Sequence, residues 1–304
     1  MAVRVGNHMS DLFDTDTGSP QGECSSAKNF TLYLGKSLEN ESDGNIDIEP
    51  NNEDLSLELL YADDINELST KLETIEEIQE KYPRILQKRG LKINQDKTEK
   101  HTISRTSNDK SWKKCKILGS LIDTQEDIKR RKSLAISSIK TLSEAFQNKN
   151  IWLSTKSVMF DTYVSSVFLY NSCLWVLTKV QEEQINSFQR RLIRTNVLCV
   201  RWPQIVRNEE VYGKTKIQPW SKRIRKQRMT WLGHLHRMEQ SVPAKRAFRY
   251  AEQPFQASRG RPKLTWKKMM KAQLQEDFGM TWEEAADKST DRKEWRALVY
   301  NKYK

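Results

Sequence analysis

Apolar and polar positions alternate along residues 56–61, and two adjacent acids follow this stretch. Leu57, Leu59 and Tyr61 share one side of the alternation, which predicts a β-strand. A tight turn directly after the strand would lift Asp63 and Asp64 to the tip of a hairpin. Adjacent carboxylates repel each other, so such a pair is tolerated in solvent or around a divalent cation. A polar hairpin tip with no further role is the alternative interpretation.

Other parts of the first hundred residues also have a clear period. Residues 3–5 and 9–16 predict two short segments that return on each other at the Gly6-Asn7 turn. Apolar residues between Ala27 and Leu38 recur at helical spacing, as do those between residues 72 and 86. The second helix is expected to end before Gly90 and to kink or stop early at Pro83. Residues 91–98 predict a short returning strand.

From Ile128 onward the pattern is mostly helical. One apolar face runs from Leu134 to Phe146, and another occupies residues 185–197, whose polar face carries three arginines. Residues 158–177 are apolar enough to imitate a membrane span. They include Asp161 and Asn171, and their apolar residues cluster rather than run on, so we interpret them as a buried helix. Before these helices, residues 117–122 predict a strand pair that turns at Gly119-Ser120.

Charge is distributed unevenly along the 304 residues. Residues 1–80 hold 4 Lys and Arg against 19 Asp and Glu, whereas residues 81–304 hold 48 against 21. Between Lys214 and Lys271 there are 17 basic residues and two acids, with aromatic residues interleaved. Such a segment is typical of nucleic-acid binding, because basic side chains contact phosphates and aromatic rings stack on unpaired bases. A basic surface that is merely soluble is the alternative.

The four cysteines are scattered and form no CxxC pair, and the histidines complete no zinc spacing. Reduced thiols in an intracellular protein of the cytoplasm or nucleus are the simplest interpretation. The N-terminus has no basic-then-apolar signal pattern, and we expect no association with membranes.

Four motifs occur in an order that is typical of one family of enzymes. Residues 17–22, Thr-Gly-Ser-Pro-Gln-Gly, resemble motif B of reverse transcriptases, and Tyr61-Ala-Asp-Asp resembles the catalytic motif C. Residues 90–99 resemble motif D and residues 117–119 resemble the turn of motif E. Together they resemble the reverse transcriptases of non-LTR (LINE-type) retrotransposons. The resemblance is strong to residue 120 and looser beyond.

The resemblance implies an RNA-directed DNA polymerase. In the family, two Mg²⁺ ions, replaceable by Mn²⁺, stabilise the attacking and leaving oxygens of nucleotidyl transfer. Asp63 would be an essential metal ligand, Asp64 its accessory neighbour, and Lys97 a catalytic lysine near the leaving pyrophosphate. The implied partners are an RNA template, a DNA primer, target DNA and deoxynucleoside triphosphates. Substrate would contact residues of motifs B and C: Gly18, Pro20, Gln21, Gly22 and Tyr61.

One part of the family's catalytic set has no counterpart in this sequence. The second essential aspartate belongs to motif A, upstream of motif B, and Asp11, Asp14 and Asp16 lie too close to motif B to replace it. We therefore expect a reverse transcriptase fragment that is inactive by itself unless an upstream segment completes it. Alternatives are a non-catalytic nucleic-acid-binding remnant and a basic helical protein with chance motifs.

The resemblance also divides the chain into regions of an α+β fold. Residues 1–125 would form a partial palm, with a short antiparallel sheet and helices, residues 126–200 a helical thumb, and residues 201–304 a basic helical C-terminal region. The thumb and tail would hold nucleic acid through phosphates. The Arg259-Gly-Arg-Pro stretch is also similar to the core of an AT-hook. The predicted nucleic-acid-binding residues are Arg190, Arg191, Arg194, Arg223, Arg225, Arg228, Trp231, Arg259, Arg261 and Lys263.

Overall fold

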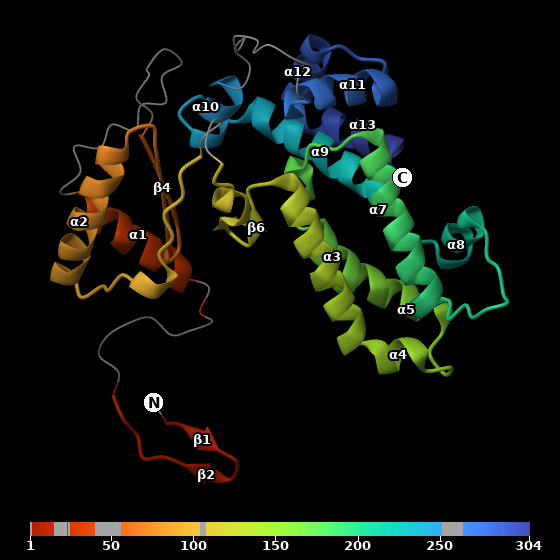
Figure 1. The fold of residues 1–304 in the computed structure, drawn as a ribbon, viewed down its shortest axis with the longest axis horizontal. Helices are drawn as coiled ribbons and strands as arrows, with labels where there is room; N and C mark the ends of the chain where they lie inside the picture. The colour runs from red at the N-terminus through yellow and green to blue at the C-terminus, as the bar shows by residue number, and fades with distance from the viewer. Residues whose placement is uncertain (1, 15–22, 24, 40–55, 104–107, 251–263) are drawn as a thin grey trace. The chain divides into compact units, whose positions relative to one another are not determined.

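The computed structural model describes residues 2–14, 23, 25–39, 56–103, 108–250 and 264–304. Contacts divide the chain into two compact units, residues 1–100 and 101–304. Most of the described residues are helical, and the strands form short antiparallel pairs (Figure 1). The architecture is therefore α+β in the broad sense. Residues 101–125, predicted to belong to the palm, lie in unit 2 together with residues 126–304, and no unit boundary falls at residue 200.

In the part of unit 1 that the structure describes there are two α-helices and two separate hairpins. Its longer hairpin pairs Leu60 with Ile65 and Tyr61 with Asp64, as the alternating pattern predicts. Leu60 and Ile65 pack against α1 and α2, around buried Leu34 and Leu86. The elements are β1 (Arg4–Val5), β2 (His8–Met9), α1 (Ser26–Glu39), β3 (Ser56–Tyr61), β4 (Asp64–Ser69), α2 (Leu72–Lys88) and a 3₁₀ turn, η1 (Gln95–Lys97).

Helix α2 passes Pro83 and ends as the sequence indicates. It continues to Lys88, so of the two alternatives predicted at Pro83, a kink or an early stop, the early stop does not occur. Burial of Ile85 and Leu86 stabilises the last turn, and two such side chains offset the roughly 3 kcal/mol that an internal proline costs. Gly90 has a φ of +73°. Its N–H bonds to the carbonyl of Gln87 at 3.0 Å, and the N–H of Leu91 bonds to that of Leu86 at 2.8 Å, which is a Schellman ending.

The predicted strand at residues 91–98 is absent. The segment contains the 3₁₀ turn η1, and no third strand joins β3 and β4 among the described residues. A strand requires a neighbour to satisfy its backbone groups, and the periodicity of the segment itself carries no information about that neighbour.

Unit 2 is a helical assembly with one small hairpin. In chain order its elements are η2 (Ser111–Lys114), β5 (Lys116–Ile117), β6 (Ser120–Leu121), α3 (Thr124–Thr141), α4 (Ser143–Gln147), α5 (Leu153–Met159), η3 (Phe160–Ser165), α6 (Ser166–Leu169), η4 (Ser172–Leu174), α7 (Lys179–Leu192), η5 (Ile193–Val197), α8 (Asn208–Thr215), α9 (Trp220–Arg237), α10 (Pro243–Tyr250), α11 (Trp266–Phe278), α12 (Trp282–Thr290) and α13 (Arg292–Lys302).

Residues 158–177 are only partly buried and do not form the single buried helix that was predicted. Phe160, Val164 and Phe168 are buried, whereas Val158 and Tyr163 are exposed. The helical run ends at Leu169, its middle part η3 is a π-helix, and Asn171 takes a left-handed φ of 58°. Phe168 lies at the centre of this packing, with its ring 4.0 Å from that of Trp220. Within the described residues, no helix combines the length and the apolarity that crossing a membrane requires.

Two apolar cores share helix α9. Its first half contributes Trp220 and Ile224 to the core around α3, η3 and α7. Its second half contributes Met229 and Leu232 to a core with α11, α12 and α13, which are grouped beside it in Figure 1. The contact with α13 is close at Gly233, where a Cβ atom would lie 2.3 Å from Nε1 of Trp295. Gly233 is thus the residue that lets the indole approach the α9 backbone.

Candidate functional sites in the acidic hairpin and the basic helices

The β3–β4 turn presents two carboxylates to solvent. Tyr61 pairs with Asp64, so Ala62 and Asp63 form the two-residue loop, and Ala62 takes a φ of 50°. The side chains of Tyr61, Asp63 and Asp64 are all exposed. The alternating pattern before Asp63 predicts this placement of the two acids at a hairpin tip, and the structure confirms it.

The donor chemistry at this tip suits a hard cation only in part. Carboxylate oxygens are the ligands that Mg²⁺ prefers. In the described part of the chain, however, no third carboxylate, histidine or cysteine brings a ligand atom close to those of Asp63 and Asp64. A two-metal centre requires bridging carboxylates from more than one element. The two aspartates therefore do not complete such a centre by themselves, and we derive no catalytic step from them alone.

A second acidic cluster lies on the inner face of the same hairpin. Glu58 and Glu67 are directly opposite each other across β3 and β4. The hydroxyl of Tyr82, on α2, lies 2.6 Å from Oε2 of Glu58 and 2.9 Å from Oε1 of Glu67. A phenol has one proton to donate, so both contacts are hydrogen bonds only if one carboxyl is itself protonated. Burial, with the charge of Glu58 adding to it, raises the pKa of Glu67 to about 7, although the bond from Tyr82 opposes the shift.

This cluster predicts that unit 1 loses stability as the pH rises. The folded state keeps a proton on Glu67 that the unfolded chain releases near pH 4.5, so stability is complete below that pH and falls until about pH 7. We expect the protection of the β3–β4 amides against hydrogen exchange, corrected for the intrinsic rate, to be lower at pH 8 than at pH 5. Glu67→Gln should remove this difference. A pH dependence that survives in Glu67→Gln would contradict the assignment.

The remaining predicted residues of the polymerase site are partly described. Lys97 lies exposed in the 3₁₀ turn η1, and the structure does not relate it to a substrate. Gly18, Pro20, Gln21 and Gly22, predicted to contact substrate, lie outside the described residues. The helix predicted to follow them is confirmed as α1.

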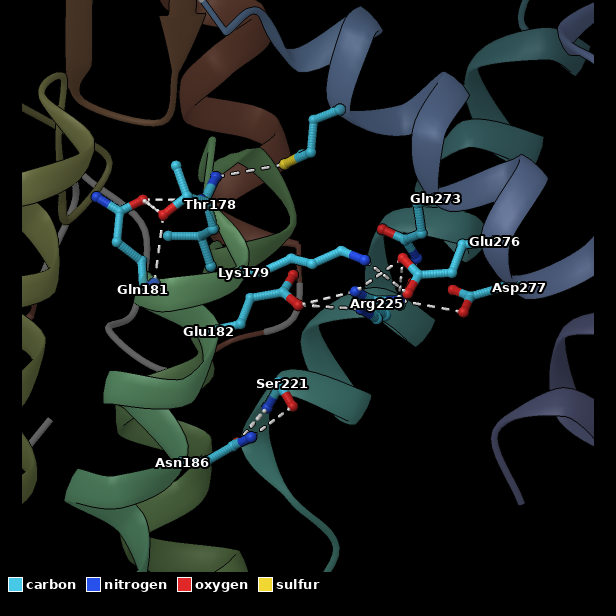
Figure 2. A network of polar contacts seen from close by, with 12 residues as sticks. Thr178, Lys179, Gln181, Glu182, Asn186, Ser221, Arg225, Gln273, Glu276 and Asp277 are labelled. Carbon is cyan, nitrogen blue, oxygen red and sulfur yellow. Dashed lines mark hydrogen bonds and ion pairs between the residues drawn. The ribbon is translucent and has the colours of Figure 1, made fainter.

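A network of ion pairs joins α7, α9 and α11 (Figure 2). Nη2 of Arg225 lies 3.0 Å from Oε2 of Glu182, and its Nη1 lies 3.1 Å from Oδ1 of Asp277. Nζ of Lys179 reaches Glu276 at 3.1 Å, and Glu276 also faces Arg225. Burial alone would lower the pKa of Arg225, but the carboxylates around it raise it overall. Arg225 therefore stabilises the packing of three helices.

Arg228 lies deeper in the same network. Its side chain is 0% exposed, its Nη1 lies 3.1 Å from Oε1 of Glu182, and its Nη2 donates to the carbonyl of Trp175 at 2.9 Å. Its burial lowers its pKa, and Glu182 opposes that effect. Because this guanidinium has no access to solvent, we correct the prediction that Arg228 contacts nucleic acid and assign it to the protein interior.

The arginines near the end of α7 have separate roles. Arg190 is 9% exposed and forms an ion pair with Glu183, so it too is a structural residue rather than a phosphate contact. Nε and Nη2 of Arg194 donate to the carbonyl of Val206 at 3.1 and 3.0 Å, and Nη2 also donates to Asn208 at 2.7 Å. Arg191 is exposed and lies over the ring of Phe188. Of these three, only Arg191 presents its side chain freely to solvent.

The other predicted nucleic-acid-binding residues are either partly exposed or outside the described residues. Arg223 pairs with Asp161 at 2.7 Å and is partly exposed, and Trp231 is partly buried with its ring 5.4 Å from that of His234. Arg259, Arg261 and Lys263, including the AT-hook-like stretch, lie outside the described residues.

Two features of interest were not predicted from the sequence. The cluster of Glu58, Glu67 and Tyr82 could have been suspected from acids at strand positions that alternate with apolar ones. Trp202, at 94% exposed, contrasts with the tryptophans that pack in the cores, such as Trp175, Trp220 and Trp295. The sequence feature that could have drawn attention to Trp202 is the basic segment around it, because residues 184–208 hold five arginines and no acid. Comparison of the chain with protein-family models, curated proteins and solved structures finds no match.

Proposed function

We propose that this chain is part of a non-LTR retrotransposon reverse transcriptase. The observation that carries the proposal is the motif C-like hairpin, in which Tyr61-Ala-Asp-Asp forms a tight turn with Asp63 and Asp64 exposed at the tip. Asp63 would be the essential metal ligand of this motif, Asp64 its neighbour, and Mg²⁺, or Mn²⁺, the ion. The reaction would be RNA-directed addition of deoxynucleotides to a DNA primer.

Asp63 and Asp64 are also the reason that we expect this chain alone to lack polymerase activity. Motif C supplies one of the family's two essential aspartates, and the described residues bring no further carboxylate beside it. A polypeptide segment that provides the second aspartate would complete the site.

The expected partner of unit 2 is the template–primer backbone. Unit 1 holds 11 Lys and Arg against 21 Asp and Glu, whereas unit 2 holds 41 against 19. Ion pairs within the protein remove Arg225 and Arg228 from this surplus, but many basic side chains remain exposed. Among the described residues from 214 to 271, the exposed basic ones are Lys214, Lys216, Arg249, Lys268 and Lys271.

The full chain is expected to bind a primed RNA template but not to extend the primer. If six phosphates are neutralised, the logarithm of the affinity should fall with the logarithm of the salt concentration at a slope of about −5. Fluorescence anisotropy across a salt series measures the slope, and primer extension with Mg²⁺ measures synthesis. Asp63→Asn is the control, because it should leave binding unchanged.

Three outcomes separate the candidate functions. Synthesis that disappears in Asp63→Asn would show that the chain is active alone and contradict its expected inactivity. Binding without synthesis, restored to synthesis by a motif A segment supplied in trans, supports the polymerase fragment. Binding that no such segment converts to synthesis favours the second candidate, a non-catalytic nucleic-acid-binding protein, for which the exposed basic residues of unit 2 are the supporting observation.

A further inference from the structure

The turn between η5 and α8 exposes two large apolar side chains. Trp202 is 94% exposed and Ile205 is 89% exposed, although Val206 beside them is buried in the core. Exposure of a whole indole opposes the hydrophobic effect, and a site that binds a flat aromatic ligand is one reason for it. Arg201 and Arg207 flank the turn, and both are exposed.

Arg194 holds both ends of this turn in place. Its backbone carbonyl accepts the N–H of Val200 at 2.9 Å, and its guanidinium donates to the carbonyl of Val206. Within the turn, the N–H of Gln204 donates to the carbonyl of Arg201 at 2.8 Å. The backbone that carries Trp202 is therefore fixed on both sides, which reduces the entropy that a ligand would have to remove.

The charges around the turn favour an anionic ligand. Residues 184–208 carry five arginines and no acid. Arg190 is paired with Glu183, whereas Arg191, Arg201 and Arg207 are exposed to solvent. Glu209 and Glu210, in the first turn of α8, are the nearest acids in the sequence, and Glu210 is paired with Lys214 at 3.6 Å. An exposed aromatic ring with exposed arginines near it in the chain suits single-stranded nucleic acid, because the ring can stack on an unpaired base and the cations can contact the adjoining phosphates.

We propose that the turn at residues 199–207 binds a single-stranded segment of nucleic acid, with Trp202 stacked on one base and Arg201 and Arg207 on its phosphates. The proposal rests on the proposed nucleic-acid-binding function and names a ligand for one part of unit 2. It concerns unpaired bases, whereas contacts with a template–primer duplex need only phosphates.

The test compares two exposed tryptophans in the full chain. Anisotropy is measured with a labelled oligo(dT), an oligo(U) and a duplex of the same length. Trp202→Ala should weaken binding of both single strands about 5- to 100-fold, the effect of one stacked base, and leave duplex binding unchanged within about twofold. Trp202→Phe should retain most of the affinity. The matched control is Trp152→Ala, since Trp152 is 81% exposed in a different loop, and it should change nothing.

Each other outcome decides against the proposal in a different way. Equal single-strand affinities in wild type and Trp202→Ala, or equal losses in Trp202→Ala and Trp152→Ala, would overturn this site and leave the proposed function standing. No binding of any nucleic acid by the wild-type chain would remove both. Self-association in sedimentation velocity that Trp202→Ala abolishes would assign the turn to contact with a second copy instead.

Discussion

Arg228→Ala is expected to lower the free energy of unfolding of unit 2 by about 3–5 kcal/mol, the usual cost of breaking a buried ion pair from one side. The substitution leaves the carboxylate of Glu182, itself 12% exposed, with Arg225 as its remaining partner. It also removes the donor to the buried carbonyl of Trp175. Urea denaturation followed by tryptophan fluorescence measures the effect on unit 2 alone, because all nine tryptophans lie between residues 112 and 295.

Arg223→Ala is the matched control for this prediction. Arg223 lies on the same helix and pairs with Asp161, but these side chains are 29% and 41% exposed. An ion pair of this kind contributes less than about 1 kcal/mol. Equal losses in the two variants would mean that Arg228 does not hold the helices together as the geometry implies.

Gly233→Ala is expected to destabilise unit 2 by up to about 2 kcal/mol, against the usual preference of helices for alanine. An added Cβ would lie 2.3 Å from Nε1 and 2.4 Å from Cδ1 of Trp295, so the indole or the helix has to move. Overpacking of a core costs about 1–3 kcal/mol and outweighs the gain of up to about 1 kcal/mol in helix propensity. The same urea titration measures it.

Gly213→Ala is expected to have the opposite effect and to raise the free energy of unfolding of unit 2. Gly213 is in helix α8, is exposed, and a Cβ there would meet no atom within 4 Å. The helix-propensity gain is then uncompensated, and stability should rise by as much as about 1 kcal/mol. If both variants stabilise unit 2, the close packing of Trp295 on α9 is not as tight as described.

The sequence predicted those elements of the fold whose formation depends on residues that are close together along the chain. The alternation of Leu57, Leu59 and Tyr61 identified the hairpin, and Gly90 identified the end of α2, because strand pleat and helix termination each depend on neighbouring residues. The acids at the hairpin tip follow from the same pattern. Their place at the tip was therefore predictable. The contact of Tyr82 with Glu58 and Glu67 was not, because it depends on how α2 packs against the hairpin.

Properties that depend on distant residues were not predictable in this way. The arginines of α7 and α9 have the spacing of a basic face, and the spacing alone does not distinguish solvated side chains from paired ones. Arg228 is internal because Glu182, 46 residues earlier, lies opposite it. The segment 91–98 begins with the strand-like alternation of Leu91 and Ile93, but no strand of the described chain lies beside it to pair with.

Helix α9 has a consequence for how unit 2 can be divided. Because its two halves contribute to different apolar cores, neither core can open without exposing buried side chains of this one helix. Unfolding of the two cores is therefore coupled, and a fragment that begins near residue 201 would leave Trp220 and Ile224 without the partners that cover them. The smallest cooperative piece that includes the basic C-terminal helices also includes α3, η3 and α7.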